Sequence, residues 1–460
     1  MIPITQLLKL QLLILVTIHR STTNFIKGFS PQFQVSQVPK VNAVDFDVHK
    51  HYFHTVQNGT IYETPVLVEN VLSPSLCEEM CDSIGYNLGH VTVDVQRKQK
   101  FISVDDDNKN DDDDDDDDVQ TDIYEYALYD AFALMMESSH YDSFFCFCEG
   151  LLDYTDSSNH DNIDTTENND ENNEMTMGNE DIKQLLATTK EDLFGCSDSN
   201  HGDLFDSFPK NAKPSDCVII AGSGATSTLH RDPFCWTGTS ICLEGTKVWR
   251  FIAPPGAVNG IQEDETDSIY NDDSGVNVID SLLNAYRLSS IAWEGSSRQE
   301  DSVYLSSGWQ SDYSLFSSFN NYEEFPSAEE LELMNKKEKL SVIENLANNL
   351  EELSPNCPKT YIAAGSENQR TQVTIWTVVQ KPGDLLVIPA FWWHQTYALE
   401  PSVAVASQRC GEERDCPRVL KHILDTSGRV KNDEYPPFVQ EEYIANQSTE
   451  ALVDELFQYL

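Results

Sequence analysis

The stretch Ser227-Thr-Leu-His230-Arg-Asp232-Pro places a histidine and a carboxylate two residues apart. On a β-strand, side chains two residues apart point to the same face, so His230 and Asp232 can bind one metal ion together. A second histidine, His394, follows far downstream in Pro389-Ala-Phe-Trp-Trp-His394-Gln. Two histidines and one carboxylate are the ligand set of mononuclear non-haem iron sites, which keep positions open for oxygen. The sequence therefore predicts an iron centre held by these three side chains.

Apolar runs flank both halves of this predicted metal site. Before the first histidine, Asp216-Cys-Val-Ile-Ile-Ala-Gly is typical of a buried strand that ends at a glycine. After it, two short strands are predicted around the turn Glu244-Gly-Thr246. The second histidine lies between buried strands predicted in Pro382-Gly-Asp-Leu-Leu-Val-Ile-Pro389 and in Ser402-Val-Ala-Val-Ala-Ser407. The metal ligands are therefore expected on the strands of a mainly β domain with peripheral helices.

Three segments together carry a family pattern: Ser227 to Pro233, Gly245-Thr-Lys247-Val-Trp249, and Pro382-Gly-Asp384 through His394-Gln. In this order they resemble the JmjC (Jumonji-C) family of iron(II)- and 2-oxoglutarate-dependent oxygenases, in particular its small hydroxylases. The resemblance covers roughly residues 60 to 255 and 375 to 410. It implies a double-stranded β-helix, a jelly-roll, cupin-like barrel.

The resemblance also implies roles for individual residues. The three predicted ligands would hold iron and form the catalytic centre. Lys247 would pair with the distal carboxylate of 2-oxoglutarate, and a dianionic cosubstrate inside a barrel needs such a buried cation. Ser227 falls where small family members place a hydroxyl that binds the same carboxylate. A tyrosine often assists, and the candidates are Tyr129 and Tyr124 in Tyr124-Glu-Tyr-Ala-Leu-Tyr129.

Three positions depart from the family pattern. Ser240 stands where some small members have asparagine, and Ala406 and Gln408 stand where the last barrel strand often offers threonine and asparagine. Residues that neighbour the ligands tune metal sites. These departures therefore leave open the alternative of a cupin-like binding or scaffold protein that no longer catalyses a reaction.

The predicted reaction consumes 2-oxoglutarate and O2, releases succinate and CO2, and hydroxylates a protein side chain. Demethylation of N-methyl-lysine uses the same chemistry and stays open as an alternative. The sequence contains no Cys/His-rich modules of the kind that read histones, which favours the hydroxylase.

The composition is strongly acidic, with 77 Asp and Glu against 30 Lys and Arg and a formal net charge of −47. Much of this charge lies in two segments, residues 105–118 and 157–180. Like-charged segments with few apolar residues do not bury enough surface to fold, so we expect long acidic disordered insertions. Such a surface argues against nucleic-acid binding through a basic patch and permits a basic protein substrate.

We expect one oxygenase core enlarged by insertions. The predicted parts are a signal peptide (1–20), an N-terminal entry region (21–103), an acidic loop (104–121), the barrel (122–410) with insertions at about 150–190 and 258–372, and a C-terminal helical tail (411–460). The smaller elements predicted within them are strands at 64–70, 90–95 and 144–147, and helices that begin at Ser73 or cover 122–136, 325–353, 419–424 and 449–460. The second insertion could form a lid or be inert, and the tail could pair two subunits in a homodimer.

The N-terminus bears on the cellular compartment. Leu10-Gln-Leu-Leu-Ile-Leu-Val-Thr-Ile18 follows a single basic residue and resembles a secretory signal peptide, and it is too short to span a membrane. No other stretch is apolar enough to do so. Glycosylation sequons begin at Asn58 and Asn446 and fit the lumen of the endoplasmic reticulum. A nuclear or cytoplasmic location stays open. The 11 cysteines cannot all pair within one chain, and no C-x-x-C pair indicates structural zinc.

Overall fold

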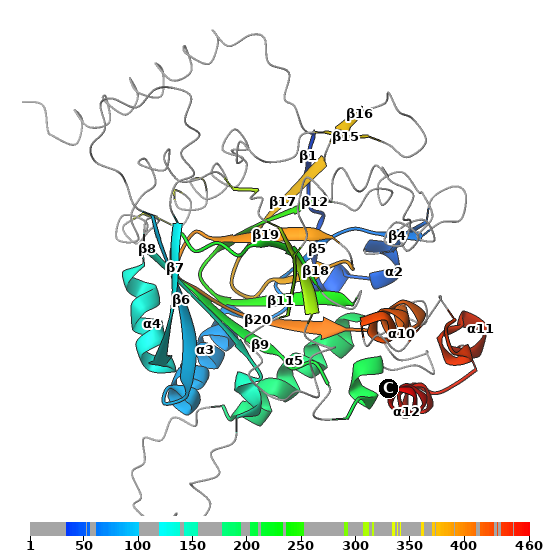
Figure 1. Cartoon of the computed structure of the whole chain (residues 1–460). Helices are drawn as coiled ribbons and strands as arrows, with labels where there is room; N and C mark the ends of the chain where they lie inside the picture. Colours follow the sequence, from blue (N-terminus) through cyan, green and yellow to red (C-terminus); the bar gives the residue numbers. More distant parts are fainter. Residues whose placement is uncertain are drawn as a thin grey trace, which may run out of the picture.

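The computed structural model describes residues 34–51, 53–55, 61–100, 119–138, 142–154, 177–194, 203–209, 213–232, 236–252, 289–292, 307–311, 315–316, 334–335, 338, 341, 360–362, 370–372, 374–390, 392–410, 415–426, 430, 434–444 and 446–460. Over these residues the chain forms two large β-sheets with helices beside them (Figure 1).

Each sheet combines strands that are distant in sequence. In spatial order, the smaller sheet contains β1 (Gln34–Gln37), β17 (Thr374–Gln380), β12 (Lys247–Ile252), β19 (Trp393–Ala398), β10 (Leu229–Arg231), β14 (Ser307–Ser311) and β13 (Ser289–Ala292). The larger sheet contains β2 (Lys40–Asn42), β5 (Val66–Glu69), β18 (Leu385–Ile388), β11 (Thr237–Glu244), β20 (Ser402–Arg409), β9 (Cys217–Ala221), β8 (Asp142–Glu149), β6 (Thr92–Lys100) and β7 (Val119–Ala127). Two hairpins stand apart, β3 (Phe53–Thr55) with β4 (Ile61–Glu63) and β15 (Thr360–Ile362) with β16 (Arg370–Gln372).

Eight of these strands form a double-stranded β-helix. Strands β9, β11, β18 and β20 lie in the larger sheet, whereas β10, β12, β17 and β19 lie in the smaller one. The chain therefore passes from one sheet to the other at every step except between β12 and β17, which are antiparallel neighbours. This winding is that of a jelly-roll barrel and confirms the predicted fold class.

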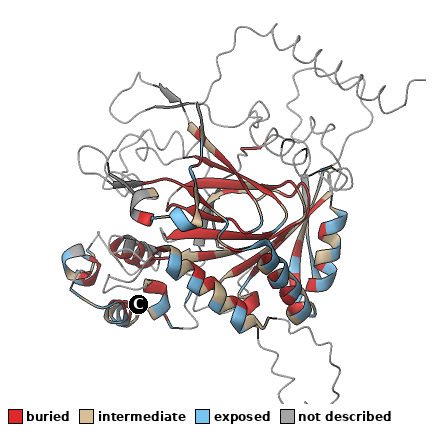
Figure 2. Ribbon diagram, turned by 180° about the vertical axis from the view of Figure 1, so that it is seen from behind, coloured by how far each residue is buried: buried red, intermediate tan, exposed pale blue. Residues whose placement is uncertain are grey.

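Helices cover the outer face of the larger sheet, as Figures 1 and 2 show. They are α3 (Pro74–Leu88), α4 (Leu128–Glu137) and α5 (Asn179–Phe194). The predicted Ser73 cap of α3 is present, because its side chain accepts a hydrogen bond from the Leu76 backbone N–H. Met80, Ala131 and Leu186, one from each helix, are buried in a single apolar cluster with residues of the sheet. Burial against the sheet thus fixes which side of each helix faces inward.

Side-chain alternation along the strands separates this outer cluster from the barrel interior. On β18, Leu385 and Val387 belong to the helix-covered cluster. Leu386 and Ile388 point to the other side, where they pack with Trp249 of the opposite sheet. Side chains alternate between the two faces of a sheet along every strand, so this alternation also identifies the residues of the other strands that face the barrel interior.

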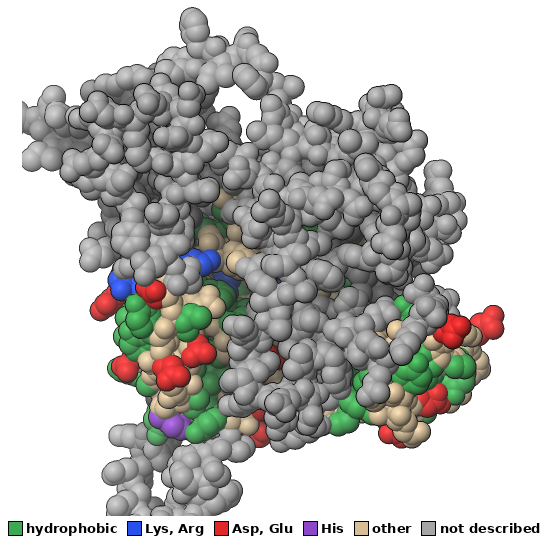
Figure 3. Space-filling model, in the orientation of Figure 1, with side chains coloured by type: hydrophobic (Ala, Val, Ile, Leu, Met, Phe, Trp, Pro, Cys, Tyr) green, Lys and Arg blue, Asp and Glu red, His purple; other side chains and the backbone are tan. Residues whose placement is uncertain are grey.

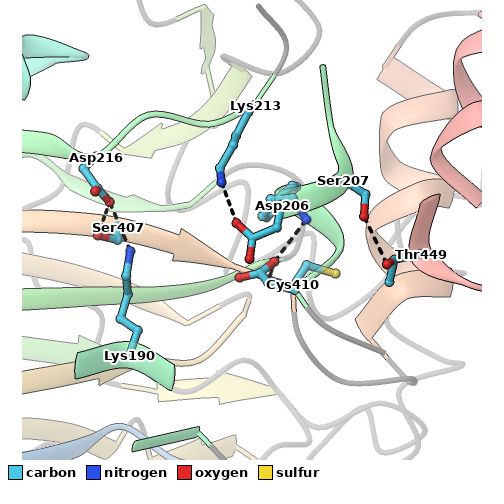
Figure 4. Close-up of polar contacts among 10 residues, drawn as sticks. Lys190, Asp206, Ser207, Lys213, Asp216, Ser407, Cys410 and Thr449 are labelled. Carbon is cyan, nitrogen blue, oxygen red and sulfur yellow. Dashed lines mark hydrogen bonds and ion pairs between the residues drawn. The ribbon is translucent and has the colours of Figure 1, made fainter. Parts of the chain in front are cut away.

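The C-terminal tail packs against one end of the barrel. Its elements are α10 (Asp415–Thr426), η10 (Pro437–Val439), α11 (Glu441–Ile444) and α12 (Thr449–Tyr459), which confirms the two predicted tail helices. Their apolar sides share a cluster with η5 (Leu204–Ser207) of the same chain. Two polar contacts stabilise this junction. Ser207 Oγ lies 3.0 Å from Thr449 Oγ1 (Figure 4). The Asp203 carboxylate accepts a hydrogen bond from the Cys410 backbone N–H at 3.0 Å. Pairing of two subunits through the tail stays a prediction.

The predicted helix over residues 122–136 is wrong in its first half. Residues up to Ala127 belong to β7, which pairs with β6 along its whole length, and only Leu128–Glu137 forms a helix. Ile123, Tyr124 and Tyr126 have high β-propensity, and pairing with β6 decides between strand and helix. The predicted acidic loop therefore ends before Val119, and its residues 104–118 lie outside the described residues.

The structure describes parts of both predicted insertions, whereas the acidic segments predicted to be disordered, 105–118 and most of 157–180, lie outside the described residues. The first contains η3 (Leu151–Asp153) and α5, whose Ile182 and Leu186 are buried against the sheet. The second contributes β13 to β16. Most of the helix predicted at 325–353, the signal segment (1–20) and Asn58 lie outside the described residues. Two short elements near the N-terminus complete the fold, η2 (Ala43–Asp45) and α2 (Val48–His51). Within the described part of the chain, no helix has the length and apolar composition needed to cross a membrane.

Candidate metal centre

The structure brings the three predicted metal ligands together inside the barrel. His230 on β10 and His394 on β19 are direct cross-strand partners, with ring centroids 4.2 Å apart. Asp232 directly follows β10, and its Oδ1 lies 3.8 Å from Nε2 of His394. The three potential donor atoms lie within 4.8 Å of one another. We call these residues the metal group; the structure brings them close enough together to bind one metal ion.

Backbone carbonyls orient both imidazole rings. Nδ1 of His230 lies 2.8 Å from the Thr228 carbonyl oxygen, and Nδ1 of His394 lies 3.0 Å from the Trp392 carbonyl oxygen. A carbonyl only accepts hydrogen bonds, so each Nδ1 carries the proton and donates it. This leaves the lone pair of each Nε2 free for a metal ion, which is the orientation that metal-binding histidines usually have.

The electrostatic setting also suits a metal ion. Burial, and then the neighbouring His394, lower the pKa of His230, while Asp232 and the Thr228 carbonyl raise it by less. The imidazole is therefore neutral at pH 7 and can act as a ligand. Two imidazoles and one carboxylate, with nitrogen and oxygen donors, fit Fe(II) and other divalent first-row metals.

Lys247 lies in the same interior as the metal group. Its side chain points to the same side of β12 as Trp249 and Phe251, whose rings lie 5.9 and 6.0 Å from His394. Lys247 is 3% exposed, and no carboxylate of the described residues pairs with it. Burial lowers the pKa of its ammonium group, opposed by smaller effects of the Cys242 and Cys217 thiols. A buried cation without a counter-charge is costly, so this position suits an anionic ligand.

A buried hydroxyl on the opposite sheet adds to this polar interior. Ser240 on β11 is 1% exposed, and within the described residues its Oγ has no hydrogen-bond partner. It shares the interior face of β11 with Gly238, which contacts Asp232. Ala406 and Gln408 are the cross-strand partners of Ser240 and Gly238. The three departures from the JmjC pattern thus lie side by side on the larger sheet.

The other two predicted site residues have different surroundings. The Ser227 hydroxyl accepts a hydrogen bond from the Thr396 backbone N–H at 2.9 Å and donates to the Thr228 carbonyl at 3.1 Å. Its role as a cosubstrate ligand stays a prediction. Tyr129 is 71% exposed on α4, which packs on the outer face of the larger sheet, so the structure does not bring it to the metal group. Tyr124 on β7 is also exposed and lies near Asp122.

Residues 62–407, which are 346 of the 460 residues, match the family model described as the cupin-like domain. The chain belongs to the cupin-like domain family. No curated protein matches the sequence. In this cupin-like domain the metal group sits where strands of the two halves of the barrel meet, at the pairing of β10 with β19.

Sequence reasoning missed two residues that shape the site of this cupin-like domain. Gln395, next to a metal ligand, is 3% exposed; its side chain donates to the Ser227 carbonyl at 2.9 Å and accepts the Leu315 backbone N–H at 2.6 Å. It thereby ties β19 to the segment before β10. Gly238 was missed although an isolated glycine in a strand often marks a close approach of another group. A Cβ at Gly238 would lie 2.6 Å from Oδ2 of Asp232.

Gly238→Ala should therefore weaken metal binding, and the new Cβ, 3.3 Å from the Cβ of Ile388, should also lower fold stability slightly. The added methyl group would push the Asp232 carboxylate, the flexible end of a side chain, away from the two histidines. Disturbing ligand orientation typically costs about 10–100-fold in metal affinity. Titration with Fe(II) or Co(II) measures this loss, and thermal unfolding of the metal-free protein measures stability. Gly85→Ala on α3 is the matched control, since a Cβ there would contact only Phe132, at 4.0 Å. Equal metal affinity of the two variants would contradict the prediction.

Proposed function

We propose that this cupin-like protein is an Fe(II)- and 2-oxoglutarate-dependent oxygenase of the JmjC type that hydroxylates a protein side chain. The observation that carries the proposal is the metal group, in which two imidazoles oriented by backbone carbonyls and one carboxylate converge within 4.8 Å. The buried and uncompensated Lys247 supports it, because 2-oxoglutarate carries a second carboxylate that needs such a partner. Iron, 2-oxoglutarate and O2 would together supply the oxidation of a C–H bond, with release of succinate and CO2.

The chain's own residues would bind the metal, orient the cosubstrate and exclude water from the site. His230, Asp232 and His394 would occupy one face of the metal and leave the other face open. Lys247 would bind the distal carboxylate and so fix the direction of the cosubstrate. Trp249 and Phe251, which are 5% and 0% exposed, form an apolar wall beside His394. Such a wall keeps the local dielectric low and strengthens the charge interactions inside.

The surface bears on the class of substrate. On the face shown in Figure 3, acidic side chains outnumber the few basic ones, in line with the net charge of −47. An acidic surface repels the phosphates of nucleic acids and attracts cationic protein segments. We therefore propose a protein substrate with basic residues near the target side chain.

The decisive test needs no knowledge of the substrate. Anaerobic addition of Fe(II) and 2-oxoglutarate should produce the weak visible charge-transfer band of the chelated metal. Release of succinate upon admission of O2 should follow. If the wild-type protein shows neither signal, a binding or scaffold role replaces the oxygenase. Mass comparison of peptides from cells with and without the active protein then separates the reactions, since hydroxylation adds one oxygen and demethylation removes a methyl group.

A further inference from the structure

A second lysine reaches the barrel from outside the eight barrel strands. Lys98 lies on β6, and its Nζ donates a hydrogen bond to the Thr226 carbonyl at 3.0 Å. Thr226 immediately precedes Ser227 and lies four residues before His230, so Lys98 contacts the segment that leads into the metal strand. Neither the sequence motifs nor the proposed roles of the metal group account for this lysine.

Strand alternation places Lys98 on the interior side of its sheet. Val93 and Val95 of β6 belong to the helix-covered outer cluster. Arg97 follows on that side, where it pairs with Asp142. Lys98 must therefore point to the opposite side. Its cross-strand partner on β8 is Ser143. Two residues further along β8, Phe145 packs against Ala225 and Ala398, which lie between the two sheets.

The register of β19 brings Lys98 and Lys247 to the same end of the barrel. Thr226, the hydrogen-bond partner of Lys98, pairs with Tyr397 on one side of β19. Lys247 pairs with Ala398, the next residue, on the other side of β19. The two lysines are thus related to consecutive residues of β19, Tyr397 and Ala398, and approach the barrel interior at the same end. On β19, His394 lies three residues from Tyr397 and four residues from Ala398, which is roughly 10–13 Å at about 3.3 Å per residue.

Lys98, like Lys247, has no acidic partner among the described residues. Desolvation is the sole cause that lowers the pKa of its ammonium group. Other partly buried lysines are compensated: Lys183 pairs with Asp153 at 2.8 Å, and Lys190 pairs with Asp216 at 3.2 Å. The chain has more than twice as many acidic as basic residues, so a shortage of carboxylates does not explain the difference. Two uncompensated cations at one end of a barrel suit the terminal carboxylate of an elongated anion.

We propose that Lys98 binds the distal carboxylate of 2-oxoglutarate together with Lys247. This inference rests on the proposed oxygenase function and adds a residue to its cosubstrate site. Lys98 would take the role that the JmjC resemblance implied for Tyr129 or Tyr124, both of which are exposed, on α4 and β7. The alternative is a structural role, in which Lys98 only ties β6 to the Thr226 carbonyl.

Lys98→Gln separates the two roles, because glutamine removes the charge and keeps a hydrogen-bond donor for the Thr226 carbonyl. Each variant is loaded with Fe(II) without oxygen and titrated with 2-oxoglutarate and, separately, with 2-oxopentanoate, which has the same length but lacks the distal carboxylate. The charge-transfer band reports the dissociation constant. We expect Lys98→Gln to raise the dissociation constant of 2-oxoglutarate about tenfold or more, which is the usual effect of losing a charged hydrogen bond. The dissociation constant of 2-oxopentanoate should not change. Lys98→Arg should retain most of the affinity.

The matched control is Lys183→Gln on α5, which removes a lysine charge from the outer, helical side of the molecule and should change neither titration. An unchanged 2-oxoglutarate affinity in Lys98→Gln, or an equal loss for both 2-oxo acids, would overturn the inference while the oxygenase proposal stands. If wild-type protein gives no band at all, the proposed function fails and the inference falls with it.

Discussion

Asp232→Ala and His394→Ala should each abolish the iron charge-transfer band and reduce succinate release to background. Each change removes one of three ligands whose donor atoms lie within 4.8 Å, and the two that remain cannot hold the metal in a fixed geometry. Loss of a residue that merely orients a ligand costs about 10–100-fold in metal affinity, so loss of a ligand should cost at least 100-fold. Calorimetric or spectroscopic titration of the metal-free variants measures the effect.

His90→Ala is the histidine control for this experiment. The His90 ring packs edge-on against Tyr154 at 5.8 Å between centroids, and it is not part of the metal group. The control variant should bind iron like the wild-type protein. Wild-type iron affinity in Asp232→Ala or His394→Ala would show that the metal binds elsewhere.

Lys247→Met should weaken 2-oxoglutarate binding about 10–100-fold, because a charged hydrogen bond contributes about 1.5–3 kcal/mol. The same change should raise the stability of the ligand-free protein by about 1 kcal/mol or more. Lys247 is 3% exposed without an acidic partner among the described residues, and replacing a poorly compensated buried charge by an apolar side chain is often stabilising. Opposite signs for ligand affinity and stability are what distinguish a binding residue from one that supports the fold.

Urea unfolding and titration with 2-oxoglutarate measure the two quantities for Lys247→Met. Lys213→Met serves as the control, since Lys213 is half-exposed and pairs with Asp206 on the surface (Figure 4). It should leave both quantities within experimental error. A Lys247→Met protein that is less stable and binds 2-oxoglutarate normally would assign the lysine a structural role.

The metal group and the strands around it could be predicted from short-range sequence patterns, whereas the barrel itself was predicted from the resemblance to the JmjC family. Residues two apart on a strand share a face, so the side chains of His230 and Asp232 are expected to point to the same side even when no tertiary contact is known. Apolar runs on both sides of each motif then indicate the strands. Lys247, by contrast, was predicted in the site from the resemblance to the JmjC family and not from the strand pattern.

The remaining features depend on which strands pair, and a single sequence does not contain that information. Ile123 and Tyr126 are compatible with a strand or a helix, and the pairing of β7 with β6 makes this segment a strand. Lys98 reaches the interior only because β6 joins the barrel through β8 and β9. Tyr129 was predicted in the site by its place in the chain, but it lies on the exposed side of α4, whose other face packs on the sheet.

The cross-strand pairing of His230 with His394 also sets the order in which the site is assembled. These residues are 164 positions apart (394 minus 230), and the second lies near the end of the barrel sequence. During synthesis, the first half of the barrel emerges with its histidine and carboxylate well before the partner strand exists. A metal bound by all three residues would therefore bind only after the second half of the barrel is in place, and a metal that binds the folded state alone stabilises that state by mass action. Under the proposed function, bound iron would therefore indicate that the barrel is complete.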